Sequence, residues 1–210
     1  MKKPARSPLK PTLICLSICA LWSQGHAALN ISQSPLFLKQ KEAPLVLLAM
    51  GKDHKMFYEA YDDRSDLDGD GLLDIGYRPE ERNGLPAIKE YYGYFDSTLC
   101  YKYNDGNGRF EPRAKATNKK CNKGVSQDEW SGDFLNYLTT ARIDALRKVF
   151  YGGKRSTDSA SETVLERAWI PQDAHSWGKE YTSEAVNGYK ISDYAPLKAP
   201  TGNTRHIFAN

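Results

Sequence analysis

Four aspartates lie within nine residues of DRSDLDGDGLLDIGY, residues 63–77. They are Asp66, Asp68, Asp70 and Asp74, at relative positions 1, 3, 5 and 9, and Gly71 occupies position 6. Carboxylates placed this densely repel one another unless a cation lies between them. Ca²⁺ binds about six to eight oxygen ligands, mostly carboxylates and carbonyls, and loops that wrap it alternate their ligands and turn sharply at a central glycine. The pattern therefore predicts a calcium site.

The backbone completes the predicted ligand set, with one gap. The carbonyl of Leu72 takes the seventh position, and Asp74 binds at the ninth, directly or through water. The twelfth position of an EF-hand is a bidentate Glu, but here it is Tyr77, and Glu80, Glu81 or a carboxylate from elsewhere in the chain is the alternative ligand. We predict an Asp-x-Asp-x-Asp-Gly calcium loop outside the regular EF-hand class. An acidic surface turn without an ion is the open alternative, and Mg²⁺ is disfavoured because it rarely uses all-protein loops.

The first 27 residues are typical of a secretory signal peptide. A basic segment precedes the apolar run TLICLSICALW, and Gly25 and Ala27 are the small residues expected before a cleavage site. The run is shorter than the ~20 residues of a membrane-spanning helix. We predict cleavage after Ala27, export, and no integral membrane segment in the remaining chain. An uncleaved N-terminal anchor is the alternative.

The charge balance changes once this segment is removed. The chain has 29 lysines and arginines against 26 acids, and the first 27 residues hold four of the bases and none of the acids. The remainder, with 25 bases and 26 acids, has a net charge of −1. This removes the basic excess that a nucleic-acid-binding protein requires.

Two of the four cysteines also fall in the signal segment, which leaves Cys100 and Cys121. An even pair in an exported chain predicts a disulfide. Closing a loop of about 20 residues stabilises a fold by roughly 3 kcal/mol. A metal-binding pair and free thiols are the alternatives.

The early part of the chain predicts few long elements. Residues 28–42 are expected to form an extended lead-in, and the apolar run APLVLLAM, residues 43–50, is typical of a buried strand, although its length does not exclude a helix. Residues 62–121 have the composition of turns and ordered loops. Within them, NDGNGRF predicts a hairpin between CYKY and RFEP.

The clearest helix is predicted over residues 131–150. Ser131 can cap its start, and Gly152 follows its end. Its apolar stripe consists of Phe134, Leu138, Ala141, Ala145, Leu146 and Val149. Beyond it, we predict a strand within 162–170, a helix beginning at Pro171 and a strand at the end of the chain.

The sequence offers no catalytic residues that we would assign. His54, His175 and His206 lack the spacing of a zinc site, and no nucleophile elbow or phosphate-binding glycine loop is present. Asp173 and His175 resemble a fragment of an acid–base pair, but a helix-start Asp and a partly buried His explain them better. We therefore predict a protein that is not an enzyme.

An ordered series of segments resembles the N-terminal region of the PilC/PilY family of type IV pilus proteins. The series is DHKMFYEAYDDRSDLDGDGLLDIGY, YYGYFDSTLCYKY, RFEP, WSGDFLNYLTTARIDALRKVFYGGKR and TVLERAWIPQDAHSWGKEY. The resemblance implies a non-enzymatic factor for pilus assembly and adhesion that works with minor pilins at the pilus tip and with host or surface ligands. It also implies a location in the periplasm, at the outer membrane surface or at the pilus tip.

The same resemblance implies a fold. Residues 43–210 would be part of an α/β domain like that of von Willebrand factor A, with an insertion at about 51–130. The family's C-terminal β-propeller is absent, so we expect an N-terminal portion of a longer protein. The family's Asp-x-Ser-x-Ser metal motif is replaced by MGKDHKMF, so that metal site is not carried over. The alternatives are a stand-alone secreted calcium-dependent module, adhesin or dockerin-like, and, less favoured, a secreted hydrolase.

Overall fold

The elements that the structure describes are short and lie after residue 50. The structure, a computed structural model, describes Leu47, Ala49, Gly51 and residues 53–62, 76–82, 84–121 and 128–210. The chain divides into two units, Met1–Ala49 and Met50–Asn210, and all of the following elements belong to the second. In chain order they are η2 (His54–Phe57), β1 (Leu99–Asn104), β2 (Arg109–Lys115), β3 (Trp130–Ser131), α2 (Gly132–Thr139), α3 (Arg142–Tyr151), β4 (Arg155–Asp158), β5 (Thr163–Leu165), β6 (Gly178–Tyr181), α4 (Glu184–Asn187), η3 (Ile191–Asp193) and β7 (His206–Ala209).

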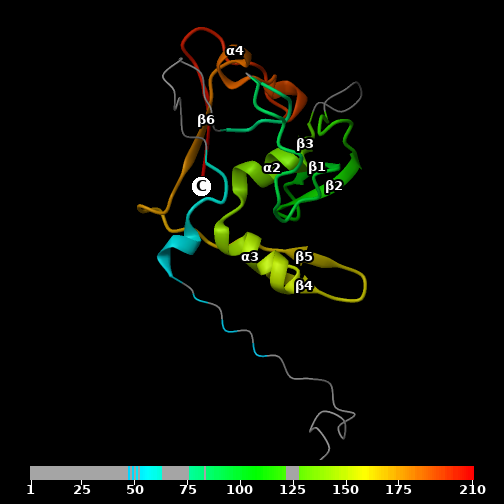
Figure 1. Cartoon of the computed structure of the whole chain (residues 1–210). Helices are drawn as coiled ribbons and strands as arrows, with labels where there is room; N and C mark the ends of the chain where they lie inside the picture. The colour runs from blue at the N-terminus through cyan, green and yellow to red at the C-terminus, as the bar shows by residue number, and fades with distance from the viewer. Residues whose placement is uncertain are drawn as a thin grey trace, which may run out of the picture. The chain divides into compact units, whose positions relative to one another are not determined.

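The described strands form three small antiparallel sheets (Figure 1), with the orders β2-β1-β3, β4-β5 and β6-β7. The predicted hairpin is present as β1 and β2, and the Asn104 side chain accepts from the backbone N–H of Gly106 at 3.0 Å to close its turn. Pro112 is tolerated because β2 is an edge strand. The described unit is thus a mixed α/β fold with small sheets.

Nothing in the described residues corresponds to the parallel sheet of an A-type domain. Every described strand pair is antiparallel. The strand predicted over 43–50 lies outside the described residues except for Leu47 and Ala49, which are exposed and belong to no strand. Among the helices of the described ranges, none combines the length and apolar character that crossing a bilayer would take.

The prediction of a single helix over residues 131–150 is wrong in one respect, because the structure has two helices there, α2 and α3. Ser131 caps α2 as expected, its Oγ accepting from the N–H of Phe134 at 3.4 Å. The helix then breaks at Thr140 and Ala141, which are extended. The backbone there pairs with an earlier segment, since Ala60 N–H donates to the Thr140 carbonyl at 2.9 Å and Ala141 is bridged to Glu59. Tertiary pairing has therefore replaced the helical hydrogen bonds.

Helix α3 does not bury every residue of the predicted apolar stripe. Val149, expected to face the core, is 66% exposed. The C-terminus behaves as expected: Gly152 has a φ of 80°, and its N–H donates to the Lys148 carbonyl at 3.1 Å. A left-handed residue at this position favours glycine, which ends the helix.

The helix predicted to begin at Pro171 is not formed. The Asp173 side chain accepts from the N–H of His175 at 2.9 Å, and Ser176 Oγ donates to the Pro171 carbonyl at 2.9 Å, so local polar bonds make a turn. Gly178–Tyr181 then pairs as β6 with β7, which confirms the strand predicted at the end of the chain. The strand predicted within 162–170 is confirmed only for β5.

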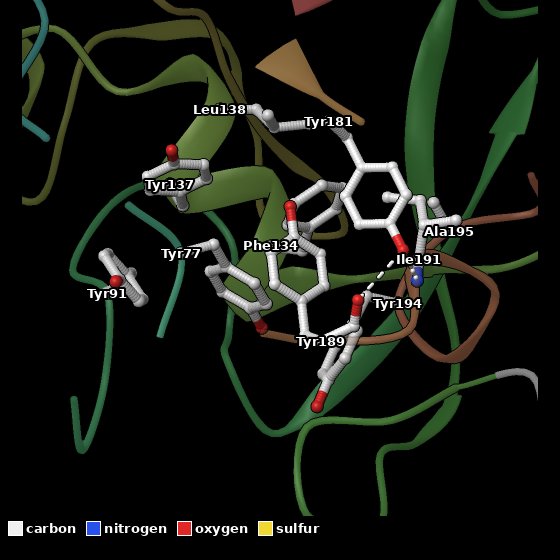
Figure 2. Packing of buried hydrophobic residues seen from close by; sticks show 10 residues of the cluster. All are labelled: Tyr77, Tyr91, Phe134, Tyr137, Leu138, Tyr181, Tyr189, Ile191, Tyr194 and Ala195. Atoms are coloured by element: carbon white, nitrogen blue, oxygen red, sulfur yellow. Dashed lines mark hydrogen bonds between the residues drawn. The ribbon is translucent and has the colours of Figure 1, made fainter. Parts of the chain in front are cut away.

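The main core is unusually rich in tyrosine (Figure 2). Its buried members are Tyr77, Tyr91, Phe134, Tyr137, Leu138, Tyr181, Tyr189, Ile191, Tyr194 and Ala195. A tyrosine can be buried at low cost when its hydroxyl finds a partner. Tyr181 illustrates this, because its hydroxyl donates to the carbonyl of Tyr189 at 2.9 Å. A second, smaller core contains Ala141, Ile143, Ala168 and Ile170.

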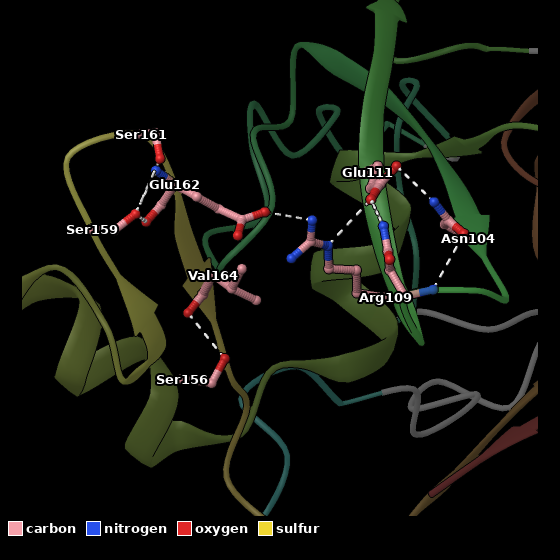
Figure 3. Close-up of polar contacts among 9 residues, drawn as sticks. Asn104, Arg109, Glu111, Ser156, Ser159, Ser161, Glu162 and Val164 are labelled. Carbon is pink, nitrogen blue, oxygen red and sulfur yellow. Dashed lines mark hydrogen bonds and ion pairs between the residues drawn. The ribbon is translucent and has the colours of Figure 1, made fainter.

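Polar contacts connect the two hairpins (Figure 3). A guanidinium nitrogen of Arg109, at the start of β2, lies 2.6 Å from Glu162 Oε1, in the turn between β4 and β5. The Nε atom of Arg109 lies 3.2 Å from Glu111 Oε1. These side chains are partly exposed, and ion pairs of this kind add little to stability. They connect the start of β2 to the turn between β4 and β5.

Candidate functional site

The five predicted calcium ligands lie in residues 63–75, outside the described residues. They are Asp66, Asp68, Asp70, the Leu72 carbonyl and Asp74. The structure does describe the residues at both ends of this loop, Tyr61 and Asp62 before it and Gly76 and Tyr77 after it. What holds these ends can therefore be examined directly.

The segment before the loop is fixed by Tyr61. Its hydroxyl donates to the Tyr92 carbonyl at 2.8 Å and accepts from the N–H of Tyr92 at 2.6 Å. Its ring also meets that of Tyr91 edge-on, with 4.9 Å between the centroids. One side chain thus uses both its ring and its hydroxyl on the same short segment.

The segment after the loop is fixed to that same place. The hydroxyl of Tyr91 donates to the Gly76 carbonyl at 2.8 Å and accepts from the N–H of Arg78 at 3.0 Å. The rings of Tyr77 and Tyr91 lie 5.3 Å apart. We call Tyr61, Tyr77, Tyr91 and Tyr92 the tyrosine frame. Both ends of the loop contact Tyr91 and Tyr92, so folding already brings the ends together. Binding an ion then needs no further loss of entropy to close the loop.

Tyr77, at the twelfth position of the loop, is an anchor in the core. Its side chain is 4% exposed, and its hydroxyl donates to Asp133 Oδ2 at 3.0 Å. Both proposed substitute ligands, Glu80 and Glu81, are exposed, and Glu80 lies 2.6 Å from Lys120 Nζ.

Asp133 joins the frame to helix α2. It is fully buried, and its Oδ1 accepts from the N–H of Tyr91 at 2.9 Å while Lys119 Nζ lies 3.3 Å from its Oδ2. Burial raises the pKa of this carboxyl, and the Tyr91 N–H bond and the nearby Lys119 charge oppose that rise. Together with the Tyr77 hydroxyl, these contacts make Asp133 the polar centre of the aromatic core.

A buried lysine connects the C-terminal sheet to the entry of the loop. Lys179 of β6 is 1% exposed, and its Nζ lies 2.7 Å from Glu59 Oε2. The same ammonium donates to the Tyr61 carbonyl and lies over the ring of Tyr137, 4.4 Å from the centroid. The β6-β7 sheet is thereby tied to the residue that begins the tyrosine frame.

The pair that had suggested acid–base chemistry is part of a turn. His175 Nδ1 lies 2.7 Å from Asp173 Oδ1, and the backbone N–H of His175 is the main cause of a lowered pKa at Asp173. The His175 ring stacks on Tyr58 at 5.2 Å and meets His54 edge-on at 5.7 Å. In the described ranges, no group of three or more His, Cys, Asp or Glu side chains is placed to hold a metal ion.

The predicted disulfide is present. Cys100 is bonded to Cys121, with 5.6 Å between the Cα atoms. The N–H of Cys121 also donates to the Asp193 carbonyl at 2.8 Å. The disulfide joins β1 to Cys121, and the hydrogen bond then connects Cys121 to the segment that carries Tyr194 of the core.

Sequence reasoning missed the buried polar residues of α2. Asn136 is fully buried, donates to the carbonyls of Tyr91 and Phe95 at 2.8 and 2.9 Å, and accepts from the N–H of Phe95 at 2.9 Å. Gly93 permits this approach, because a Cβ atom there would lie 2.3 Å from Asn136 Oδ1. The available signal was the glycine within YYGYF, which marks a close backbone contact.

The sequence is similar to a known protein family and to named relatives. Residues 86–210 match the family model described as PilY1 homolog, small alpha/beta domain. Two proteins of Xylella fastidiosa (strain Temecula1 / ATCC 700964), each named type IV pilus biogenesis factor PilY1 homolog, are similar to the chain. One is 52% identical over 164 residues, covering 78% of this chain and 10% of the relative. The other is 41% identical over 121 residues, covering 54% and 9%.

The chain thus spans about a tenth of the length of these curated relatives. No solved structure matches it.

Proposed function

Because the chain belongs to the PilY1 family of type IV pilus biogenesis factors, we propose that it forms an exported, calcium-binding and non-enzymatic part of a pilus assembly and adhesion factor. The observation that carries the calcium part of the proposal is the tyrosine frame. It fixes both ends of an aspartate-rich loop on Tyr91 and Tyr92. A loop with fixed ends loses less entropy when it wraps an ion.

The chemistry of the loop supports calcium as the ion. Asp66, Asp68, Asp70 and Asp74 supply carboxylates, and Leu72 supplies a carbonyl. Extracellular calcium modules bind with a Kd on the order of 10⁻⁴ to 10⁻³ M at the weak end. An exported protein meets calcium at such concentrations, so the proposed compartment and the proposed ion agree.

The location and partners follow from the family and remain proposals for the longer protein. We place it in the periplasm, at the outer membrane surface or at the pilus tip, where it would work with minor pilins and with host or surface ligands. Removal of residues 1–27 during export belongs to the same proposal. The A-type domain with an insertion at about 51–130 also remains a proposal. It requires that the parallel strands of its sheet lie outside the residues that the structure describes.

We expect the full chain to bind one Ca²⁺ per molecule by calorimetry, and the double variant Asp68→Ala/Asp70→Ala to lose this binding. Removing two carboxylates leaves the loop too few ligands for an ion that takes about six to eight oxygens. Asp105→Ala/Asp128→Ala is a matched control, because it removes the same charge from exposed positions elsewhere. Calcium binding that persists unchanged in the loop variant would show that these aspartates are not ligands.

The pilus role is tested in a piliated bacterium whose full-length protein contains this region. Deleting the gene is expected to reduce piliation, twitching and surface attachment, and the wild-type gene should restore them. The Asp68→Ala/Asp70→Ala gene should restore them poorly if calcium is required. Unchanged piliation and attachment after deletion, in a strain without an intact paralogue, would contradict the pilus role itself.

A further inference from the structure

Trp169 lies between two buried residues, yet its own side chain is exposed to solvent. Its side chain is 78% exposed, while its neighbours Ala168 and Ile170 are buried in the smaller core. Burial alternates along residues 167–170, so Arg167 and Trp169 lie on the same outer side of the segment. A large aromatic side chain kept exposed at a fixed position is typical of a binding site.

Asp144 holds the backbone of residues 167–170 in place through Ala168. The N–H of Ala168 donates to both carboxylate oxygens of Asp144, at 3.0 and 2.9 Å. Asp144 is itself buried on α3 and accepts from the Tyr94 hydroxyl at 3.2 Å. The backbone beneath Trp169 is therefore positioned before any ligand arrives, which lowers the entropic cost of binding.

Trp169 lines two hollows in the surface. One, of about 720 Å³, is lined by Glu166, Arg167, Ala168, Trp169, Ile170, Gln172 and Asn210. The other, of about 520 Å³, is lined by His54, Phe57, Arg147, Lys154, Ala168, Trp169, Pro171 and His175. Each is large enough for a sugar-sized ligand unit. The shared ring could therefore contact consecutive units of one chain-like ligand.

The charges around the ring favour an anionic ligand. Arg147, Lys154 and Arg167 line the two hollows together with the carboxylate of Glu166, and Arg147 is already paired with the buried Asp144, 3.6 Å away, which leaves Arg167 and Lys154 for a ligand. Lys154 Nζ lies 2.8 Å from Glu166 Oε2, but both side chains are about half exposed, and such a pair is weak. A ligand carboxylate can compete for these cations, and Arg in particular binds carboxylates in a bidentate manner.

We propose that Trp169 is the stacking platform of a binding site for an acidic oligosaccharide, with Arg167 and Lys154 binding its carboxylates. A pyranose ring presents an apolar C–H face that fits one aromatic ring, and hydroxyls that suit polar neighbours such as Gln172. One aromatic ring shared by two hollows that cationic and polar side chains line suits consecutive units of such a ligand. The proposal does not depend on the calcium loop.

The test is calorimetry of the full chain with two probes of equal length and linkage, a β-1,4-mannuronate hexamer and mannohexaose. A chelator in every titration removes calcium, so this proposal and the calcium proposal can fail separately. We expect the mannuronate hexamer to bind at least about tenfold more tightly than mannohexaose. Trp169→Ala should weaken that binding about tenfold or more, and Arg167→Gln/Lys154→Gln should abolish the preference for the acidic probe.

Phe150→Ala is the matched control, because it removes another exposed aromatic ring from the same unit. Circular dichroism confirms that each variant is folded, and Trp169 is exposed enough for its removal to leave the core intact. Failure of wild-type protein to bind the mannuronate hexamer would overturn the proposal. Equal binding of both probes, or binding unchanged by Trp169→Ala, would overturn it as well.

Discussion

Replacing Asp133 with alanine is expected to lower the free energy of unfolding by about 3 kcal/mol. The substitution removes the partner of three groups at once: the N–H of Tyr91, the hydroxyl of Tyr77 and the ammonium of Lys119. Asp133 is fully buried, so the two tyrosine donors would stay in the core unpaired. The cost comes from leaving buried polar groups without partners rather than from the lost attraction alone.

Urea unfolding followed by circular dichroism, with the disulfide kept oxidised, measures this effect. Asp133→Asn should cost less than Asp133→Ala, because an amide oxygen can still accept from the Tyr91 N–H. Asp128→Ala is the matched control: its pair with Lys102 is half exposed, and a change of about 0–1 kcal/mol is expected. A loss below 1 kcal/mol in Asp133→Ala would contradict the role given to this residue.

Opening the disulfide is the second change with a large expected effect. Cys100→Ser/Cys121→Ser should lower the free energy of unfolding by about 3 kcal/mol, because the bond closes a loop with a sequence separation of 21 residues. The closed loop contains the β1-β2 hairpin turn and ends at Cys121, whose N–H bonds the Asp193 carbonyl. In the reduced chain this whole segment gains conformational freedom in the unfolded state.

The measurement compares urea midpoints with and without a reductant. Wild-type protein should shift to the midpoint of the double serine variant when it is reduced, and the variant itself should not respond. Equal midpoints for oxidised and reduced wild-type protein would mean that the bond contributes nothing to stability.

The features that could be predicted from the sequence are those set by neighbouring residues. Ser131 caps a helix, Gly152 ends one, and the turn after Asn104 forms a hairpin, because each depends on bonds within a few positions. The disulfide was predictable because two of the four cysteines fall in the predicted signal peptide, which leaves one pairing for the others. In each case the local chemistry and the tertiary structure require the same conformation.

The remaining features depend on residues far along the chain. The helix breaks at Thr140 because its carbonyl is taken by the N–H of Ala60, and nothing near Thr140 in the sequence signals that partner. Gly178–Tyr181 is a strand because it pairs with His206–Ala209. Strand formation of this kind reflects the pairing partner more than local propensity.

The candidate site divides in the same way. The aspartate loop is a contiguous pattern, and its calcium prediction rests on the sequence. The tyrosine frame and Asp133, which joins it to α2, come from segments around 61, 77, 91 and 133 that the sequence does not place together. Tyr77 looked like a defect in a calcium motif, and only its hydrogen bond to Asp133 explains why a tyrosine stands there.

The arrangement of the frame has a mechanical consequence for a protein proposed to work on pili. Tension along the backbone that enters at Tyr61 and leaves at Tyr77 has a parallel route across Tyr91 and Tyr92, through the hydroxyl contacts at both ends. We expect a modest pulling force to be carried by these hydrogen bonds before it extends residues 63–75. An ion bound between the two ends would then feel the force only after the hydrogen bonds of Tyr61 and Tyr91 break.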